Sequence, residues 1–187
     1  MLYRPVVLDS EIQFSQKKFI VSKTDKEGKI LFVNKNFCEV SGYTEAELLG
    51  ETHSVLRHPD MPKAIFYLIW KSLLAGVEVS AIIKNLTKSG QYYWVIADFS
   101  VKRDAKGEID SFSSLRRVAP SYVSEAIEPL YQEMLVAERK GGVEASLRCL
   151  ENFLAQKEMS YEEFLEDLAQ PKGVFAFLVE NFKRVLN

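Results

Sequence analysis

The sequence predicts an α+β protein, in which a five-stranded antiparallel sheet has short helices on one face and an all-helical extension behind it. The first observation is the order of apolar patterns, which reads as two strands, several short helices and then three strands. The second is a set of turn signals at residues 25–28, 88–90 and 104–107, each placed between two strand patterns. The third is helical spacing of apolar residues from residue 121 onward. Short helices on one face of an antiparallel sheet define the α+β class.

The first strands form a hairpin that leads into two short helices. Residues 19–24 alternate apolar and polar side chains, and residues 30–33 form the returning strand after a turn that ends at Gly28. Asn34 is placed as the N-cap of a helix that Gly42 ends. The pattern Thr44-x-x-Glu47 is a capping box that begins a second short helix, which Gly50 terminates.

A charged loop, residues 51–61, separates these helices from the longest helix of this domain. Pro62 occupies the place of a first helical residue. The apolar residues that we expect to face the sheet follow at helical spacing and are Ile65, Leu68, Ile69 and Leu73. Three strands come next, at residues 79–87, 91–102 and 109–117, and the first two are joined by a tight turn at Ser89-Gly90.

Residues 119–187 form the helical extension, after a lead at residues 1–18 and the α+β domain at residues 19–118. Pro129 starts or kinks its first helix, and Gly141-Gly142 breaks the pattern. A capping box, Ser160-x-x-Glu163, begins a third helix. The apolar stripes have a 3.6-residue period without a sustained heptad, so a small bundle is favoured over a coiled coil.

The fourth helical segment follows Pro171 and Gly173. Because large aromatic side chains dominate interface energetics, we expect this segment to supply a dimer or receptor contact. Its central residues are Phe175, Leu178 and Phe182.

Composition and charge restrict the function classes. Apolar residues make up 47% of the 187 residues and charged residues 27%, which is typical of a soluble globular protein. The longest apolar run, residues 64–70, is too short to span a bilayer, and the first residues lack the apolar core of a signal peptide, so a cytoplasmic protein is expected. A net charge of -2 argues against nucleic-acid binding, although residues 121–170 hold 11 acidic and 4 basic side chains.

The loop that contains Arg57, His58 and Asp60 is the first candidate binding element. A short charged loop facing an aromatic sheet is suited to a flat ligand with polar edges. Arginine offers planar donors to a pyrophosphate or to carbonyl oxygens. Asp60 could accept from a ring N–H or a ribose hydroxyl, or could orient Arg57. The alternative is a surface loop with a local ion pair, which contributes little.

The strand that follows the long helix supplies the second candidate element. By strand alternation Asn85 shares a face with Ala81 and Ile83, and Tyr93 on the next strand is expected on the same side. Trp70 could stack on an aromatic ligand, although a tryptophan in an apolar helix is more often part of the core. Trp94 is a weaker candidate than Trp70.

Four segments together resemble a known family. They are VSGYTEAELLG (40–50), RHPDMPKAIF (57–66), the Trp70 helix and KNLTKSGQYYW (84–94). Residues 19–118 resemble a PAS sensor domain, and within that superfamily the flavin-binding PAS domain of the bacterial aerotaxis receptor. The absence of a receptor signalling tail makes the chain similar to the stand-alone PAS partner of a split energy-taxis receptor.

This resemblance implies a function as well as a fold. Aerotaxis-type domains hold FAD noncovalently and report its redox state to a chemotaxis receptor, and in flavin-binding PAS domains an amide at the Asn85 position pairs with the pyrimidine edge of the flavin. The chain is therefore expected to act as a switch rather than an enzyme, without a metal site. Its partner would be a membrane-bound chemotaxis receptor, which would recruit it to the inner face of the membrane, and a homodimer is a further expectation. The candidate FAD-binding residues are Asn34, His53, Arg57, His58, Asp60, Trp70, Asn85 and Tyr93.

Three alternatives stay open at this point. Some PAS domains ligate haem iron through one histidine, so His53 or His58 could make the protein a gas or redox sensor. A cofactor-free PAS interaction module is a further alternative. A blue-light receptor fits less well, because that class needs a cysteine near His53, and Cys38 is on an earlier helix.

Overall fold

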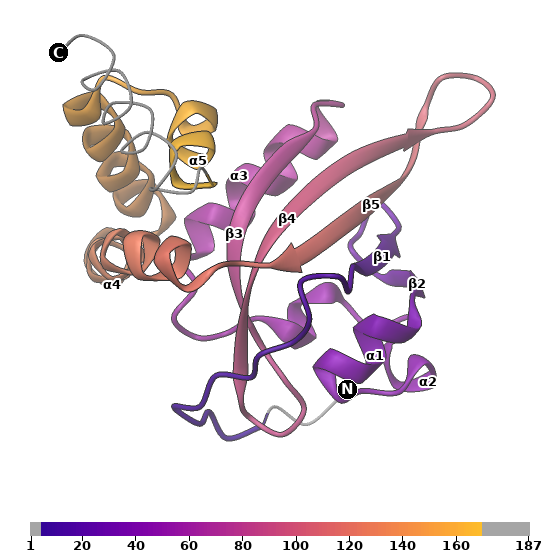
Figure 1. Cartoon of the computed structure of the whole chain (residues 1–187). Helices are drawn as coiled ribbons and strands as arrows, with labels where there is room; N and C mark the ends of the chain where they lie inside the picture. The colour runs from indigo at the N-terminus through magenta and orange to yellow at the C-terminus, as the bar shows by residue number, and fades with distance from the viewer. Residues whose placement is uncertain (1–4, 170–187) are drawn as a thin grey trace, which may run out of the picture.

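The computed structural model describes residues 5–169 and contains one five-stranded antiparallel sheet (Figure 1). The strand order is β2-β1-β5-β4-β3, so the first and last strands of the chain are neighbours in the middle of the sheet. This architecture confirms the predicted fold class. The strands are β1 (Ile20–Thr24), β2 (Ile30–Val33), β3 (Val79–Leu86), β4 (Tyr92–Arg103) and β5 (Ile109–Val118).

The pairing of β1 with β5 is the long-range event that forms the sheet. Ile20 lies opposite Arg116, and Thr24 lies opposite Phe112. β4 extends beyond the end of β5, and there the N-terminal residues take the place of a strand: the Leu8 N–H donates to the Gly90 carbonyl and the Ile12 N–H to the Tyr92 carbonyl, each at 2.8 Å. The lead is therefore joined to the sheet.

Two capped helices follow the first hairpin, as the sequence predicts. Helix α1 (Lys35–Ser41) begins at Asn34, whose Oδ1 accepts from the Phe37 N–H at 3.0 Å, and ends at Gly42 with φ of 77°. Helix α2 (Glu45–Leu48) has both hydrogen bonds of the capping box between Thr44 and Glu47. These caps supply hydrogen-bond partners to backbone groups at the helix ends that have none within the helix.

A 3₁₀ turn, η1 (His53–Leu56), and helix α3 (Lys63–Leu74) continue the chain. Ile65, Ile69 and Leu73 are buried, whereas Leu68 is only partly buried. Leu68 packs against the core as well, but less deeply than the 65–69–73 stripe. Pro62 occupies the N-cap position and supplies no side-chain cap.

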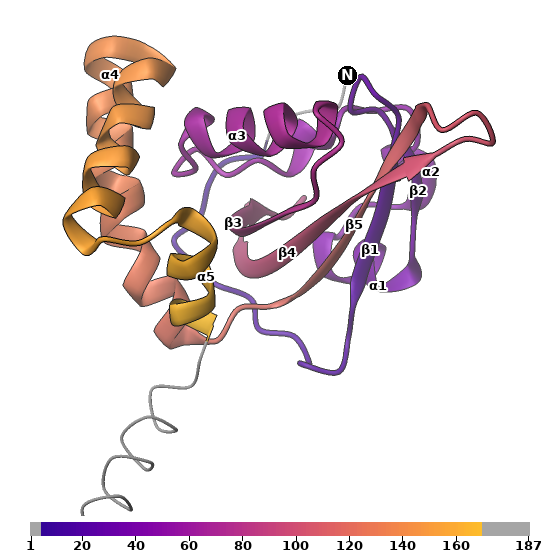
Figure 2. The same cartoon turned by 90° about the horizontal axis from the view of Figure 1, so that it is seen from above.

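The extension begins with α4 (Ser121–Lys157) and continues with α5 (Tyr161–Ala169), both at the β3 edge of the sheet, away from α1 and α2 (Figure 2). The predicted break is present, since Gly141 and Gly142 have non-helical dihedral angles, but Pro129 lies within the helix rather than at its start. Ser160 and Glu163 form the predicted cap of α5. The predicted fourth helix, with Phe175, Leu178 and Phe182, lies outside the described residues. Between residues 5 and 169, no helix is both long and apolar enough to cross a membrane.

Candidate functional site

A cavity of about 310 Å³ lies between α3 and the sheet face that α3 covers. Three walls meet there: inward side chains of β1, β3, β4 and β5, one side of α3, and the segment around η1. A cavity of this size is at the lower end of the range for small-molecule sites. Its lining includes Ser22, His53, Arg57, Phe66, Ile69, Trp70, Ile83, Asn85, Phe99, Phe112, Ser114 and Arg116.

Aromatic side chains give the cavity its flat walls. The Trp70 ring meets the Phe112 ring edge to face, with centroids 5.7 Å apart. Gly28, in the turn between β1 and β2, has φ of 82°, and a Cβ atom there would lie 2.9 Å from the Trp70 ring. Position 28 therefore requires glycine for two reasons, the backbone conformation of the turn and the close approach of the indole.

A buried polar group occupies the β1–β5 side of the cavity. Nη1 of Arg116 donates to Oγ of Ser22 at 3.0 Å, and Nη2 donates to Nε2 of His53 at 2.9 Å. Because a guanidinium group can only donate, Nε2 of His53 is the acceptor and the imidazole is neutral, with its proton on Nδ1. Burial, and then the positive charge of Arg116, lower the pKa of His53 to about 3.

Arg116 is a buried cation that pairs with no anion among residues 5–169. Only 2% of the residue is exposed, and in the described part of the chain no carboxylate lies within 4.0 Å of its guanidinium group. The rings of Phe37 and Phe99, each 5.8 Å from the guanidinium carbon, provide weak compensation. Burial lowers the pKa of Arg116 to about 10. Burying an unpaired charge is costly, so a site that retains one is suited to a ligand with an electron-rich or anionic edge.

Two further polar atoms in the cavity are buried without partners. Asn85 is 4% exposed, and its Nδ2 has no hydrogen-bond partner among residues 5–169. Oγ of Ser114 is also buried and has no hydrogen-bond partner among these residues. Since buried polar groups in folded proteins are nearly always paired, such atoms in a cavity indicate groups that a ligand completes. Arg57 lines the cavity beside Asn85, because the two residues form a backbone bridge.

The structure brings together four of the eight residues that the sequence suggests for the site, namely His53, Arg57, Trp70 and Asn85. Arg57 and Asn85, which come from the two separate candidate elements, are neighbours on one wall. Nη2 of Arg57 donates to the Met61 carbonyl at 3.1 Å, and its guanidinium group lies over the Phe66 ring at 5.0 Å. These contacts fix the side chain along the cavity wall.

Asn34 and Tyr93 do not line the cavity. Both ends of the Asn34 amide are used in the fold, because Oδ1 accepts from the Val21 and Phe37 N–H groups and Nδ2 donates to the Phe19 carbonyl. Tyr93 lies opposite Asn85 in the sheet, but its ring is buried against Phe14 from the N-terminal lead, with centroids 5.9 Å apart. The distant lead covers this position, which sequence alternation could not reveal.

His58 and Asp60 also lie outside the cavity lining. Arg57 has extended dihedral angles, so the next side chain points the other way. Nδ1 of His58 accepts from the Asp60 N–H at 3.1 Å, and its ring packs edge to face on Tyr92. Asp60 lies 3.3 Å from the Lys84 ammonium group. The expectation that the whole charged loop forms one binding wall is therefore corrected: Arg57 faces the cavity, and the next residues face the other side of β3.

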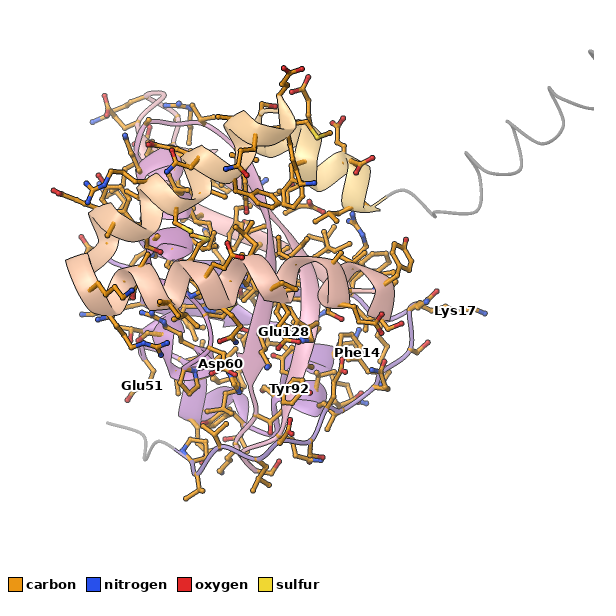
Figure 3. The ribbon with its side chains drawn as sticks, turned by 90° about the vertical axis from the view of Figure 1, so that its left-hand side faces the viewer. Phe14, Lys17, Glu51, Asp60, Tyr92 and Glu128 are labelled. Atoms are coloured by element: carbon orange, nitrogen blue, oxygen red, sulfur yellow. The ribbon has the colours of Figure 1, made fainter. Side chains whose placement is uncertain are left out.

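Lys84 is the centre of that second group of side chains. Its side chain is only 6% exposed, and its ammonium group lies 3.1 Å from Glu128 of α4 and 4.2 Å from the centre of the Tyr92 ring. Figure 3 labels three residues around it, Asp60, Tyr92 and Glu128. Burial would lower the pKa of Lys84, but the hydrogen bond and charge of Glu128, followed by Asp60, raise it. The ammonium group is thus charged and shared between a loop and a helix.

Ser114 and Arg116 are the site residues that sequence reasoning missed. Strand alternation contained a signal, because Phe112, Ser114 and Arg116 share the inward face of β5. An arginine at an inward strand position is unusual and marks either a paired charge or a site. The adjacent Arg117, which is paired with Asp98 at the surface, obscured this signal by making both arginines look like one exposed pair. Within the described residues, no cluster of histidine, cysteine and acidic side chains is arranged to hold a metal ion.

The neutral state of His53 predicts a pH-dependent stability. The unfolded chain binds a proton at His53 below about pH 6.5, whereas the folded protein does not until about pH 3. The neutral His53 side chain therefore makes its full contribution to the free energy of unfolding above pH 6.5, and this contribution is lost as the pH falls from 6.5 toward 3. Between pH 7 and pH 5 the free energy of unfolding should fall by ~2 kcal/mol more in the wild type than in His53→Gln. Denaturant unfolding at both pH values measures this, and equal losses in the two proteins would contradict the burial of a neutral imidazole.

Comparison with known proteins defines the class. A family model described as PAS fold matches residues 30–116. The aerotaxis receptor of Escherichia coli (strain K12) is 38% identical over 134 residues, which are 72% of this chain and 26% of the receptor. A nitrogen fixation regulatory protein of Klebsiella oxytoca is 27% identical over 111 residues, 59% of this chain and 22% of that protein. This chain thus spans about a quarter of the length of these relatives.

A solved structure from work on a flavin analogue and the light-oxygen-voltage domain mechanism has the same fold, with a TM-score of 0.52 and 21% identity over 62% of this chain and 87% of that one. The sheet, the helices on its inner face and the family match together define a PAS sensor domain. It is a PAS domain of the aerotaxis-receptor type.

Proposed function

We propose that the cavity binds a flavin, FAD in the cell, and that the chain is a redox sensor for energy taxis. The observation that carries this proposal is the buried amide of Asn85, whose Nδ2 lacks a partner in the described chain, on the wall of an aromatic cavity. An amide side chain donates and accepts side by side, which matches the alternating N–H and carbonyl groups on the pyrimidine edge of a flavin. The similarity to the aerotaxis receptor supports FAD over other flavins.

The remaining residues fit the same ligand. Trp70, Phe112 and Phe99 offer flat apolar surfaces for a ring system, and Ser114 offers a hydroxyl group. Arg116 would face electron-rich atoms of the ring and compensate negative charge there, while neutral His53 holds the guanidinium group in place by accepting from it. A bound flavin would supply reversible electron transfer, and the protein would tune it by charge and hydrogen bonding.

The output of such a sensor is a protein contact rather than a product. We propose that the partner is a membrane-bound chemotaxis receptor, as the similarity to a receptor that contains a comparable domain suggests. The chain would work at the cytoplasmic side of the membrane, where its partner would recruit it. A change of charge in the cavity would alter the packing of the surrounding walls and, through them, an outer surface.

Haem is not favoured by the geometry of the two histidines. His58 lies outside the cavity lining, and Nε2 of His53, the nitrogen that accepts from Arg116, has a cation within 2.9 Å. Iron ligation by that nitrogen would require the guanidinium group to leave a position in which two hydrogen bonds hold it.

Asn85→Leu tests the proposal, because it keeps the volume of the side chain and removes both polar atoms. The ligand-free fold should survive, since the substitution removes a buried Nδ2 that has no partner among residues 5–169. The dissociation constant for FAD, measured by fluorescence titration, should rise at least about tenfold. Thr87→Val is the matched control, because it removes a buried polar atom near the end of the same strand but outside the cavity.

Titrations of FAD, FMN and riboflavin into the wild type distinguish the flavins by their affinity. Unchanged flavin affinity in Asn85→Leu, or an equal loss in Thr87→Val, would show that the flavin ring does not lie against Asn85.

A further inference from the structure

Helix α4 makes two carboxylate contacts with residues that lie behind the cavity wall and do not line the cavity. Glu128 lies near its N-terminal end and contacts Lys84, which in turn contacts Asp60. Glu138 lies near the end of the first straight part of α4 and reaches the start of α3. Both contacts involve the segment 57–64, whose first residue, Arg57, lines the cavity.

Glu138 caps a helix to which it does not belong. Its Oε2 accepts from the Lys63 N–H at 2.8 Å and from the Ala64 N–H at 3.4 Å. Pro62, at the N-cap position of α3, has no side chain that could do this. A helix N-terminus attracts negative charge and leaves its first N–H groups without intrahelical partners, so Glu138 supplies from α4 what α3 lacks locally.

Glu128 forms the second contact through a shared cation. The Lys84 ammonium group lies 3.1 Å from Glu128 and 3.3 Å from Asp60. Lys84 immediately precedes Asn85 on β3, and the two side chains point to opposite faces of the sheet. The backbone bridge between Arg57 and Asn85 joins the same two segments on the cavity side. A shift of this wall therefore moves both Asp60 and Lys84 relative to α4.

We propose that Glu128 and Glu138 form a latch, which here means two contacts that hold α4 against segment 57–64. Through these contacts the packing of α4 changes when the cavity wall moves. The latch joins the inside of the domain to the extension without any residue of α4 entering the cavity. Displacement of Arg57 or Asn85 weakens one or both contacts and loosens α4. That a flavin causes this displacement rests on the proposed function, whereas the latch itself does not depend on the identity of the ligand.

Hydrogen exchange on the full chain tests the first half of the proposal. In Glu138→Ala the amides of Lys63 and Ala64 should exchange about tenfold faster, as expected for loss of a helix cap. Glu138→Gln keeps an acceptor oxygen and should restore part of the protection. Glu125→Ala, an exposed glutamate on the same helix, is the matched control and should change neither amide. Equal exchange in Glu138→Ala and in the wild type would overturn the cap.

A cavity variant tests the transmission. Arg57→Ala perturbs the cavity wall in the absence of any flavin, and it should speed exchange of the α4 amides between residues 127 and 134 at least threefold. In the Glu128→Ala/Glu138→Ala background the same substitution should add no further change. An equal effect in both backgrounds, or no effect in either, would overturn the latch. Neither result depends on flavin binding, so failure of the latch and failure of the proposed function are separate outcomes.

Discussion

Replacing Arg116 with methionine is expected to weaken flavin binding by roughly 10- to 100-fold, which corresponds to the loss of a hydrogen bond from a charged group. The same substitution should leave the ligand-free protein as stable as the wild type or more stable. Arg116 is buried beside Phe37 and Phe99 and has no carboxylate within 4.0 Å in the described chain, so methionine removes an uncompensated charge and keeps most of the apolar stem.

The two effects have opposite signs, which distinguishes a binding role from a structural one. Ser22 and His53 remain as partners, since their side chains lie 3.3 Å apart. Arg117→Met is the matched control, because Arg117 lies next in sequence but is exposed and paired with Asp98 at 2.9 Å. Equilibrium titration of FAD and denaturant unfolding of the ligand-free protein are the two measurements. A strongly destabilised Arg116→Met protein with wild-type flavin affinity would show that Arg116 serves the fold.

Tyr131→Ala is expected to lower the free energy of unfolding by roughly 3–5 kcal/mol, the loss typical of a large buried side chain. Tyr131 is 1% exposed, its ring stacks on Trp94 with centroids 6.2 Å apart, and its hydroxyl donates to the Ile82 carbonyl at 2.7 Å. It therefore joins α4 to the sheet face opposite the cavity by both a ring contact and a hydrogen bond.

Tyr131→Phe separates the ring from the hydroxyl group, and it should cost about 1 kcal/mol, the contribution of one hydrogen bond. Val136→Ala, on the exposed side of the same helix, should cost less than ~0.5 kcal/mol. Urea unfolding followed by tryptophan fluorescence measures all three, because Trp94 reports the contact directly. A loss in Tyr131→Ala no greater than that in Val136→Ala would mean that α4 does not dock on the sheet in solution.

Local features of the fold could be predicted because their causes lie within a few residues. The caps at Asn34, Thr44 and Ser160 and the break at Gly141-Gly142 all depend on near neighbours in sequence. Helical spacing also predicted the buried residues Ile65, Ile69 and Leu73, whereas the smaller burial of Leu68 depends on packing that the spacing does not contain.

The site was harder to predict, because its residues come together through pairing of strands far apart in the chain. Arg116 meets Ser22 only because β5 lies beside β1, a relationship that no local pattern contains. Asn85 could be identified from alternation within one strand, and Tyr93 shares its side of the sheet as predicted, but alternation could not show that the distant N-terminal lead covers Tyr93. Asp60 was assigned to the ligand because nothing in the sequence shows that Lys84 and Glu128 lie beside it.

The absorption spectrum of the purified chain, with and without added FAD, tests the central claim most directly. We expect the two visible bands of an oxidised flavin, shifted and sharpened from those of free FAD by the aromatic cavity, in a protein with close to one flavin per chain. The bands should bleach on reduction and return in air. A haem Soret band, or a spectrum of added FAD identical to that of free FAD, would contradict it.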